Sequence, residues 1–214
     1  MVRLVSGRSS TVSKQLPKGF ESPFVLYFYG DSFVLMNSPM PEKLEEALSS
    51  MKGRKNELYK KARSVVLKHW ESKEFGSATQ APKQPSYFVA KKAVQRVLAA
   101  VGLDRVNIAF TASDPISEST LRFFFSIDLP VMDTFGQSEC TGPHLISSHN
   151  AFKIGTVGRG MPGTHTKIHP ESEELLYTGR HIFAGYMHME EKTREAVDDE
   201  GYLHSGDFAQ VRMI

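Results

Sequence analysis

The stretch from Asp133 to Glu139 brings together side chains that could bind a nucleotide. Phe135 is followed by Gly136, Ser138 and Glu139. A flat aromatic ring can stack on a base, and a glycine allows close backbone approach. A hydroxyl can donate to a phosphate oxygen, and a carboxylate is a hard ligand for Mg²⁺. We interpret this stretch as one half of a nucleotide site.

A second short sequence, Ser205-Gly206-Asp207, follows well downstream. Its order after the first stretch makes a chance occurrence of the pair improbable. The plainer alternative is that Ser138 and Glu139 cap a local turn and that Asp207 ends a loop. The combination of order, spacing and flanking residues favours the nucleotide site.

Three segments carry a resemblance to the adenylate-forming superfamily, and within it to the bubblegum-type long-chain acyl-CoA synthetases. They are Phe135 to His144, Gly179 to Tyr186, and Asp198 to Asp207. The resemblance is strong over residues 107–210, weaker over 39–105 and nearly absent before. It implies an α/β fold that is part of the large N-terminal domain of an adenylate-forming enzyme. This part would combine a parallel βαβ layer with a small β-rich subdomain.

The resemblance also implies an activity. Members of this superfamily make an acyl-AMP from ATP and a carboxylic acid and then pass the acyl group to a thiol. We therefore expect a long-chain fatty acid–CoA ligase with fatty acid, ATP and CoA as partners and Mg²⁺ as cofactor. Ser138, on the α-phosphate, and Glu139, on the metal, are the expected catalytic residues. The expected ATP/AMP contacts come from Ser113, Asp114, Phe135, Gly136, Ser138 and, at the ribose hydroxyls, Asp207.

Parts of the pattern depart from the family. Asp114 replaces a small residue, and its charge is expected to weaken nucleotide affinity. Leu16 to Gly19 resembles the end of the phosphate-binding loop without the preceding glycines, so a chance match is the stronger reading. The hinge and the C-terminal lid are not found, and we expect an incomplete chain that is inactive alone. The alternatives are a non-catalytic nucleotide-binding or scaffold protein and an enzyme that adenylates an aryl or amino acid.

Composition excludes several classes of protein. The 214 residues carry 26 basic and 24 acidic side chains without long charge runs, which gives no footprint for nucleic acid. The single Cys140 suits a reducing compartment and a buried packing role. No apolar run reaches the roughly 20 residues of a spanning helix, and no signal peptide is evident. We expect an intracellular protein, cytoplasmic or peripheral on the endoplasmic reticulum or another membrane.

Hydrophobic periodicity divides the chain into a divergent, partly disordered leader (1–37), a partial α/β nucleotide-binding subdomain (38–150) and a β-rich subdomain (151–214). Helices are predicted over 57–69, 87–101 and 117–127, with strands over 24–29, 33–36, 106–110 and 130–134. The strand–helix–strand order predicts a right-handed βαβ unit. Loops 111–115 and 135–139 would then begin where parallel strands end and face one pocket.

The β-rich part is predicted to contain strands over 166–169, 174–177 and 182–183, a helix over 190–197 and a turn over 198–201. Gly158, Gly160 and Gly163 spell a dinucleotide fingerprint, but Pro162 and the missing helix pattern favour a turn. His165 and His169 lie on a predicted strand, which makes zinc improbable. His144 either lines the mouth of an acyl tunnel or is a plain packing or surface histidine, and the sequence does not decide between these roles.

Overall fold

The structure is a computed structural model that describes residues 2–4, 26–27, 33–35, 53–100, 103–112 and 116–211. It comprises two compact units, each built from separate segments of the chain. Unit 1 contains residues 1–21, 133–148 and 156–214, and unit 2 contains residues 22–132 and 149–155. The boundaries of the leader and the two subdomains stay a prediction from the sequence.

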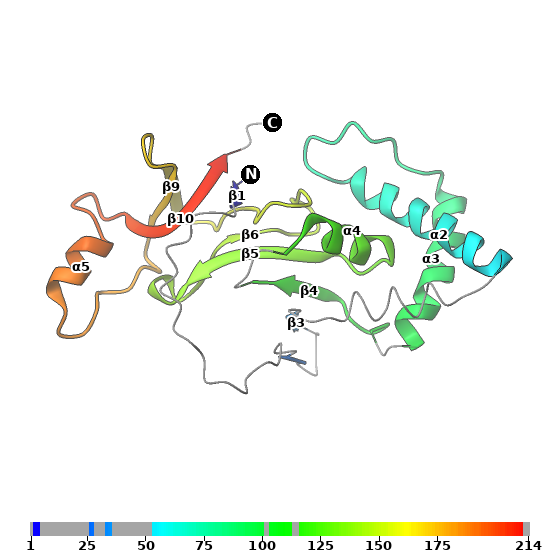
Figure 1. Ribbon diagram of the computed structural model, residues 1–214, viewed down its shortest axis with the longest axis horizontal. Helices are drawn as coiled ribbons and strands as arrows, with labels where there is room; N and C mark the ends of the chain where they lie inside the picture. The colour runs from blue at the N-terminus through cyan, green and yellow to red at the C-terminus, as the bar shows by residue number, and fades with distance from the viewer. Residues whose placement is uncertain are drawn as a thin grey trace. The chain divides into compact units, whose positions relative to one another are not determined.

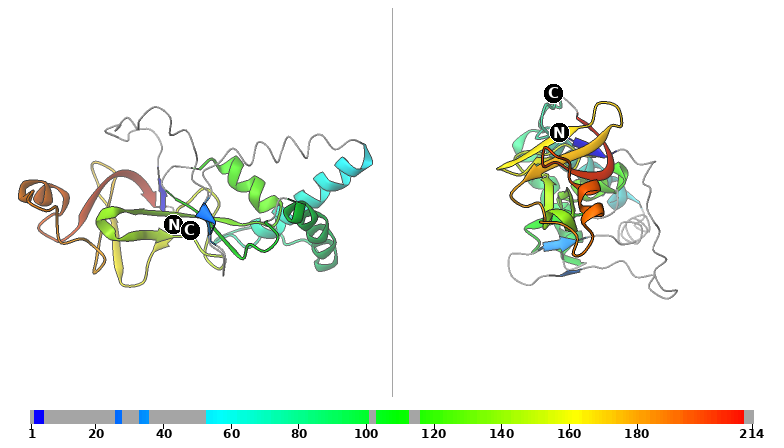
Figure 2. Two further views of the ribbon diagram at one scale, coloured as in Figure 1. Left: turned by 90° about the horizontal axis from the view of Figure 1, so that it is seen from below. Right: turned by 90° about the vertical axis from the view of Figure 1, so that its left-hand side faces the viewer.

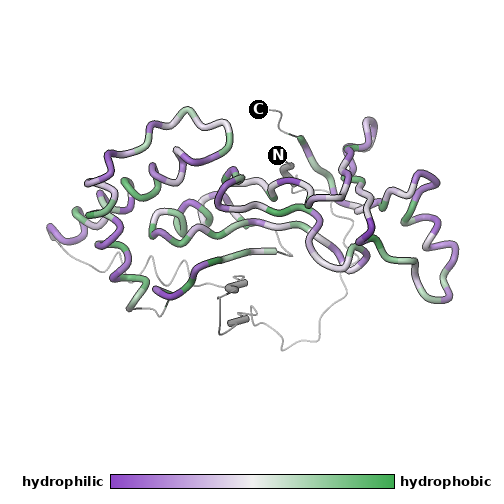
Figure 3. The backbone as a smooth tube through the Cα atoms, turned by 180° about the vertical axis from the view of Figure 1, so that it is seen from behind, coloured by the Kyte–Doolittle hydropathy of each residue, from purple (hydrophilic) through white to green (hydrophobic). Residues whose placement is uncertain are grey.

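Three helices form the α-layer of unit 2: α2 (Arg54–Glu71), α3 (Gln84–Ala100) and α4 (Glu118–Ser126). They confirm the predicted helices and extend the first two by several residues. Hydrophilic and hydrophobic residues alternate along α2 and α3 (Figure 3), as expected for helices with one buried face. At the start of α4, the Ser117 hydroxyl accepts a hydrogen bond from the Thr120 amide at 3.1 Å. This cap confirms the predicted role of Ser117.

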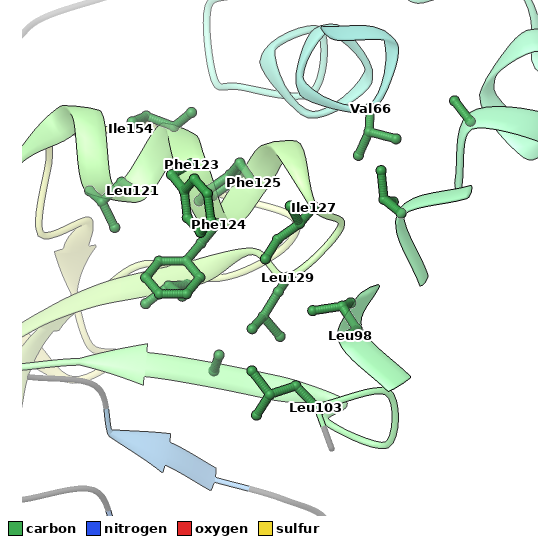
Figure 4. Packing of buried hydrophobic residues seen from close by; sticks show 14 of the residues in the cluster. Val66, Leu98, Leu103, Leu121, Phe123, Phe124, Phe125, Ile127, Leu129 and Ile154 are labelled. Atoms are coloured by element: carbon green, nitrogen blue, oxygen red, sulfur yellow. The ribbon is translucent and has the colours of Figure 1, made fainter. Parts of the chain in front are cut away.

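The core of unit 2 lies where α2, α3 and α4 meet (Figure 4). Val66 of α2, Leu98 of α3 and Phe124 of α4 are almost fully buried there. Burial of one such side chain contributes about 1.5–3 kcal/mol, so this cluster is a main source of the unit's stability.

A buried carboxylate joins the helices of unit 2. The Asp128 side chain is 4% exposed and forms an ion pair with Lys91 at 2.8 Å. Its Oδ1 atom accepts hydrogen bonds from Trp70 at 3.1 Å and from Tyr87 at 3.2 Å. Because a buried charge is tolerated only when it is paired, these contacts fix α2 and α3 against the turn that follows α4.

The strands of unit 2 include β2 (Leu26–Tyr27), β3 (Phe33–Leu35) and β4 (Ile108–Thr111). β3 pairs with β4 in parallel, and β2 pairs with β3 antiparallel. The chain continues through α4 to β5 (Val131–Gln137), whose first two residues belong to unit 2 and whose other residues belong to unit 1. The predicted strand–helix–strand sequence is therefore confirmed (Figure 1).

Unit 1 contains an antiparallel sheet in the order β1, β10, β9, β8. Its strands are Val2–Leu4, Leu203–Val211, Glu174–Gly179 and Thr164–Ile168, and β8 to β10 run side by side in yellow to red (Figure 2). The sequence predicted no strand over residues 2–4, where β1 pairs antiparallel with β10. Backbone pairing needs no strong side-chain pattern, so the three residues of β1 carry no pattern that would predict a strand.

The remaining elements of unit 1 are β6 (Gly142–Ile146), β7 (Arg159–Gly160), the short 3₁₀ helix η1 (Ser138–Cys140) and α5 (Glu190–Ala196). α5 and the turn at 198–201 confirm their predictions. The strand predicted at 182–183 is wrong. The Ile182 amide bonds to the Gly179 carbonyl at 3.2 Å, so this apolar pair lies in a turn.

Among the described residues, no helix combines the length and apolar character needed to cross a bilayer.

Candidate nucleotide site

Phe135 and Gly136 lie inside strand β5 and not in a loop after it, which corrects the prediction for the 135–139 segment. β5 pairs antiparallel with β6, and the register shifts between these two residues. A Cβ atom on Gly136 would overlap the backbone carbonyl of Gly142 and the Cα atom of Pro143. Only glycine permits this approach, so the strand continues to Gln137 and the loop begins at Ser138.

The ring of Phe135 belongs to the core of unit 1. The residue is 7% exposed and packs in a cluster with Leu145, Leu203 and Tyr177. Its ring meets Tyr177 edge to face, with 6.1 Å between the centroids. Adenine stacking on Phe135 stays a prediction, and it requires a face of the ring to become uncovered.

The predicted catalytic pair begins η1, where Ser138 is exposed and Glu139 partly exposed. Glu139 Oε1 accepts a hydrogen bond from the Tyr186 hydroxyl at 2.7 Å, and the Glu139 carbonyl accepts one from the Phe183 amide at 2.7 Å. The bond to Glu139 is the first cause that raises the pKa of Tyr186 to about 12. The phenol is therefore a hydrogen-bond donor at neutral pH, and it orients the carboxylate.

The Glu139 carboxylate fits a magnesium ion chemically. One oxygen accepts from Tyr186, which leaves the second oxygen for a cation. Mg²⁺ keeps several waters and commonly takes one or two protein carboxylates together with substrate phosphates. The described residues hold no group of three or more acidic, histidine or cysteine side chains in metal-binding geometry. Among the described residues Glu139 would therefore be a single protein carboxylate on the ion, and its metal role stays a prediction.

Gln137 joins the two predicted halves of the site within unit 1. Its Nε2 atom donates to the Ser205 carbonyl at 2.7 Å and lies 3.5 Å from Asp207 Oδ2. Its Oε1 atom accepts from the Tyr177 hydroxyl at 2.7 Å. The segments Gln137–Glu139 and Ser205–Asp207 are therefore neighbours, although about seventy residues separate them in the sequence.

Asp207 lies inside β10, where the register with β9 shifts between His204 and Phe208. Local hydrogen bonds define this Ser205–Asp207 bulge. The Asp207 amide donates to Ser205 Oγ at 3.0 Å, and Gly206 has a positive φ of 72°. The Glu174 carboxylate accepts from the Gly206 amide at 2.8 Å and lies 3.0 Å from His204 Nδ1. Burial, and next the charge of Glu174, raise the pKa of Asp207. A donor such as a ribose hydroxyl would relieve this unfavourable environment.

The other predicted contacts cannot be placed beside this group. Ser113 and Asp114 lie outside the described residues, as does Leu16 to Gly19. Their predicted contacts with a nucleotide stay predictions.

His144 and Cys140 are interior residues. His144 has no exposed surface, stacks on Tyr177 with 4.1 Å between the centroids, and lies 2.8 Å from Thr166 Oγ1. Of the two roles predicted for it, packing is the one observed. Burial, and next the charge of His181, lower the pKa of His144 to about 4. Cys140 is 1% exposed, which confirms its predicted burial.

The expected turn is present at Pro162 and Gly163, after β7 (Arg159–Gly160), and no helix follows. His165 lies in β8, as predicted, whereas His169 lies just after the end of that strand. A separate cavity of about 380 Å³ in unit 1 is lined by Thr141, Pro143, Met161, Arg180 and His181 among others. Of the predicted site residues that the structure describes, none lines this cavity.

The sequence analysis missed Gln137, Tyr186 and Glu174 as parts of the site. Gln137 occupies the variable position between Gly136 and Ser138, and the residue type alone did not indicate that it orients a neighbouring group. Tyr186 closes the segment Gly179 to Tyr186, so its place in a second motif was an available signal. Glu174 acts on a backbone amide, and such contacts leave no residue pattern.

Relatives of known name place the chain in a family. Long-chain-fatty-acid–CoA ligase ACSBG2 from Xenopus laevis is 40% identical over 178 residues, which are 79% of this chain and 24% of the relative. The protein of the same name from Gallus gallus is 39% identical over 79% of this chain and 23% of its own length. The chain belongs to the bubblegum-type long-chain acyl-CoA ligases. Long-chain-fatty-acid–CoA ligase heimdall from Drosophila melanogaster is 29% identical over 79% of the chain and 26% of its own length.

This bubblegum-type chain spans about a quarter of the length of the relatives it matches. No family model matches it. Among solved structures, ATP-bound MatB from Rhodopseudomonas palustris is 19% identical in sequence. The match covers 54% of this chain and 26% of the MatB chain. The TM-score of that match is 0.45, a similarity too low to carry an argument.

Proposed function

We propose that this chain is the nucleotide-binding part of a long-chain fatty acid–CoA ligase. Such an enzyme uses ATP to adenylate a fatty acid and then transfers the acyl group to CoA. Two findings support the proposal. The named relatives are long-chain-fatty-acid–CoA ligases. The hydrogen bond from Gln137 to the Ser205 carbonyl joins the two segments that carry the predicted phosphate, metal and ribose contacts.

The roles of the residues follow from their chemistry. The exposed Ser138 hydroxyl donates to an α-phosphate oxygen, and the half-buried Asp207 carboxylate accepts from both ribose hydroxyls. Glu139, oriented by Tyr186, holds Mg²⁺ through its second oxygen. The bound ion supplies charge neutralisation at the phosphates. A carboxylic acid is a poor electrophile, and AMP gives it a good leaving group once the phosphate charge is offset.

We further propose that these 214 residues bind nucleotide but do not turn over alone, because they span only a quarter of the relatives' length. A fatty-acid-dependent exchange between ATP and pyrophosphate tests this. No exchange by the purified chain is expected, and rapid exchange would contradict the claim.

Calorimetry with AMP tests the site itself. Asp207→Asn should weaken AMP binding at least about tenfold, because hydrogen bonds to charged groups are worth about 1.5–3 kcal/mol. Asp199→Asn is the matched control, since Asp199 is an exposed residue in a turn of unit 1, the unit that also contains Asp207. Equal AMP affinity for the wild type and Asp207→Asn would overturn the ribose assignment.

A second candidate is a non-catalytic nucleotide-binding or scaffold protein of the same fold. The burial of Phe135 favours it, because a covered ring offers adenine no stacking face. Under this reading AMP binds weakly or not at all while the chain stays folded. Calorimetry together with circular dichroism separates the two candidates.

We also propose an intracellular location, cytoplasmic or peripheral on a membrane such as the endoplasmic reticulum. A fatty acid substrate and a single buried thiol support it. Fractionation of cells that express the chain tests this, and recovery from the medium alone would contradict it.

A further inference from the structure

The side-chain amide of Gln137 has its orientation fixed by its partners. A carbonyl oxygen can only accept, so the NH₂ group must face Ser205 O at 2.7 Å. The amide oxygen then faces the Tyr177 hydroxyl, which must donate at 2.7 Å. Burial raises the pKa of Tyr177, so the hydroxyl keeps its proton at neutral pH. One amide group thus satisfies a donor and an acceptor from two different strands.

Tyr177 gives this arrangement a rigid base. The residue has no exposed surface, and its ring lies between the stacked ring of His144 and the edge of Phe135. A hydrogen bond to so rigid a group fixes the orientation of the Gln137 side chain. Gln137 therefore links the Ser205–Asp207 bulge to the rigid core of unit 1.

The second N–H of Gln137 points toward the Asp207 carboxylate, 3.5 Å from Oδ2. Glu174 also binds the Ser205–Asp207 bulge, because its carboxylate accepts a hydrogen bond from the Gly206 amide at 2.8 Å. The negative charge of Glu174 repels that of Asp207, whereas the amide of Gln137 attracts it. Loss of Gln137 would leave the Asp207 carboxylate without this attraction and the Ser205 carbonyl without its donor.

We propose that Gln137 is a positioning residue that holds the Ser205–Asp207 bulge of β10, and with it the Asp207 carboxylate, in place for the two ribose hydroxyls. This inference rests on the proposed function, because the ribose role of Asp207 is assigned there. It adds a residue that touches no part of the nucleotide and acts through Asp207.

Selectivity for the ribose hydroxyls tests the inference. AMP and 2′,3′-dideoxyadenosine monophosphate are titrated into the wild type and Gln137→Met, which keeps the side-chain length and removes the side-chain contacts with Ser205, Tyr177 and Asp207. Gln137→Met should bind AMP about tenfold more weakly and the dideoxy nucleotide less than about twofold more weakly. Gln210→Met, at an exposed position of β10, is the matched control and should leave both affinities unchanged. An equal loss for both nucleotides, or no loss, would overturn the inference.

Hydrogen exchange supplies a test that needs no nucleotide. The Gly206 and Asp207 amides are bonded to Glu174 and Ser205, so they should exchange slowly in the wild type. Exchange there should become about tenfold faster in Gln137→Met. Tyr177→Phe is the second variant, to be used if Gln137→Met does not fold. It keeps the ring, removes the hydroxyl that donates to Gln137, and should speed exchange at the same amides to a smaller degree.

The two kinds of failure are distinguishable. A wild type that binds both nucleotides equally well defeats the ribose assignment of the proposed function. Unchanged exchange at Gly206 and Asp207 in the Gln137 variant defeats the positioning role, whether or not any nucleotide binds.

Discussion

The buried histidine of unit 1 should make the protein sensitive to mild acid. His144 has no exposed surface, and its pKa is lowered from 6.5 to about 4 by burial first and by the charge of His181 next. The unfolded chain takes up the proton near pH 6.5, but the folded chain does so only near pH 4. The unfolded state therefore binds more protons between these values, and stability falls as the pH falls through this window.

The size of the effect follows from the two pKa values. Relative to neutral pH, His144 should cost the fold about 2.5 kcal/mol at pH 4.5, since one pKa unit corresponds to about 1.4 kcal/mol. Loss of this much would be a large fraction of the stability of a small unit.

Urea unfolding at pH 7 and at pH 4.5 provides the measurement. His144→Gln removes the titrating group, so its free energy of unfolding should fall less on acidification than that of the wild type, by about 2.5 kcal/mol. The comparison cancels the other histidines, which are common to both proteins. His188→Gln, at an exposed position, is the matched control and should behave as the wild type. The reasoning would be refuted by an NMR titration of the His144 ring near pH 6.5, or by equal acid sensitivity of the wild type and His144→Gln.

Three further predictions concern neighbouring residues of unit 1. Gly136→Ala should lower the free energy of unfolding by more than about 2 kcal/mol, because the new methyl group overlaps the Gly142 carbonyl; an unchanged melting temperature would contradict this. Asp133→Asn should stabilise the protein at pH 8 by about 1–4 kcal/mol, because burial raises the pKa of Asp133 to about 7 and the ionised form is costly. That gain should vanish as the pH falls toward 4, and a gain that persists there in urea unfolding would argue against burial as the cause. The Cys140 thiol should react with a chromogenic disulfide reagent only after addition of urea, and fast reaction of the native protein would show that it is not buried.

The sequence predicted elements whose side chains follow a clear period. The helices α2 and α3 bury one apolar face each, and at α4 Ser117 provides a cap with a recognisable residue type. Hydrophobic periodicity reports such faces directly, because burial selects the side chains.

Backbone-driven features were harder to predict. β5 runs on through Gly136 because the missing side chain lets β6 approach, whereas a glycine in a sequence usually suggests a turn. The apolar pair Ile182 and Phe183 packs against the core of unit 1 from a turn, so burial occurred without a strand. Tertiary contact overrode the local pattern in both cases.

The candidate site shows the same division. The motif identified Ser138, Glu139 and Asp207 as residues with suitable chemistry, and the structure brings their segments together. The partners that orient them, Gln137 and Tyr186, depend on three-dimensional contacts across about seventy and forty-seven residues. Residue types and spacing do not encode such contacts.

The central claim is that two separated segments, Ser138–Cys140 and Ser205–Asp207, bind one nucleotide. An AMP titration followed by NMR tests it most directly. Amide signals of both segments should shift together and fit one dissociation constant. Shifts confined to one segment, or two clearly different dissociation constants, would contradict the claim.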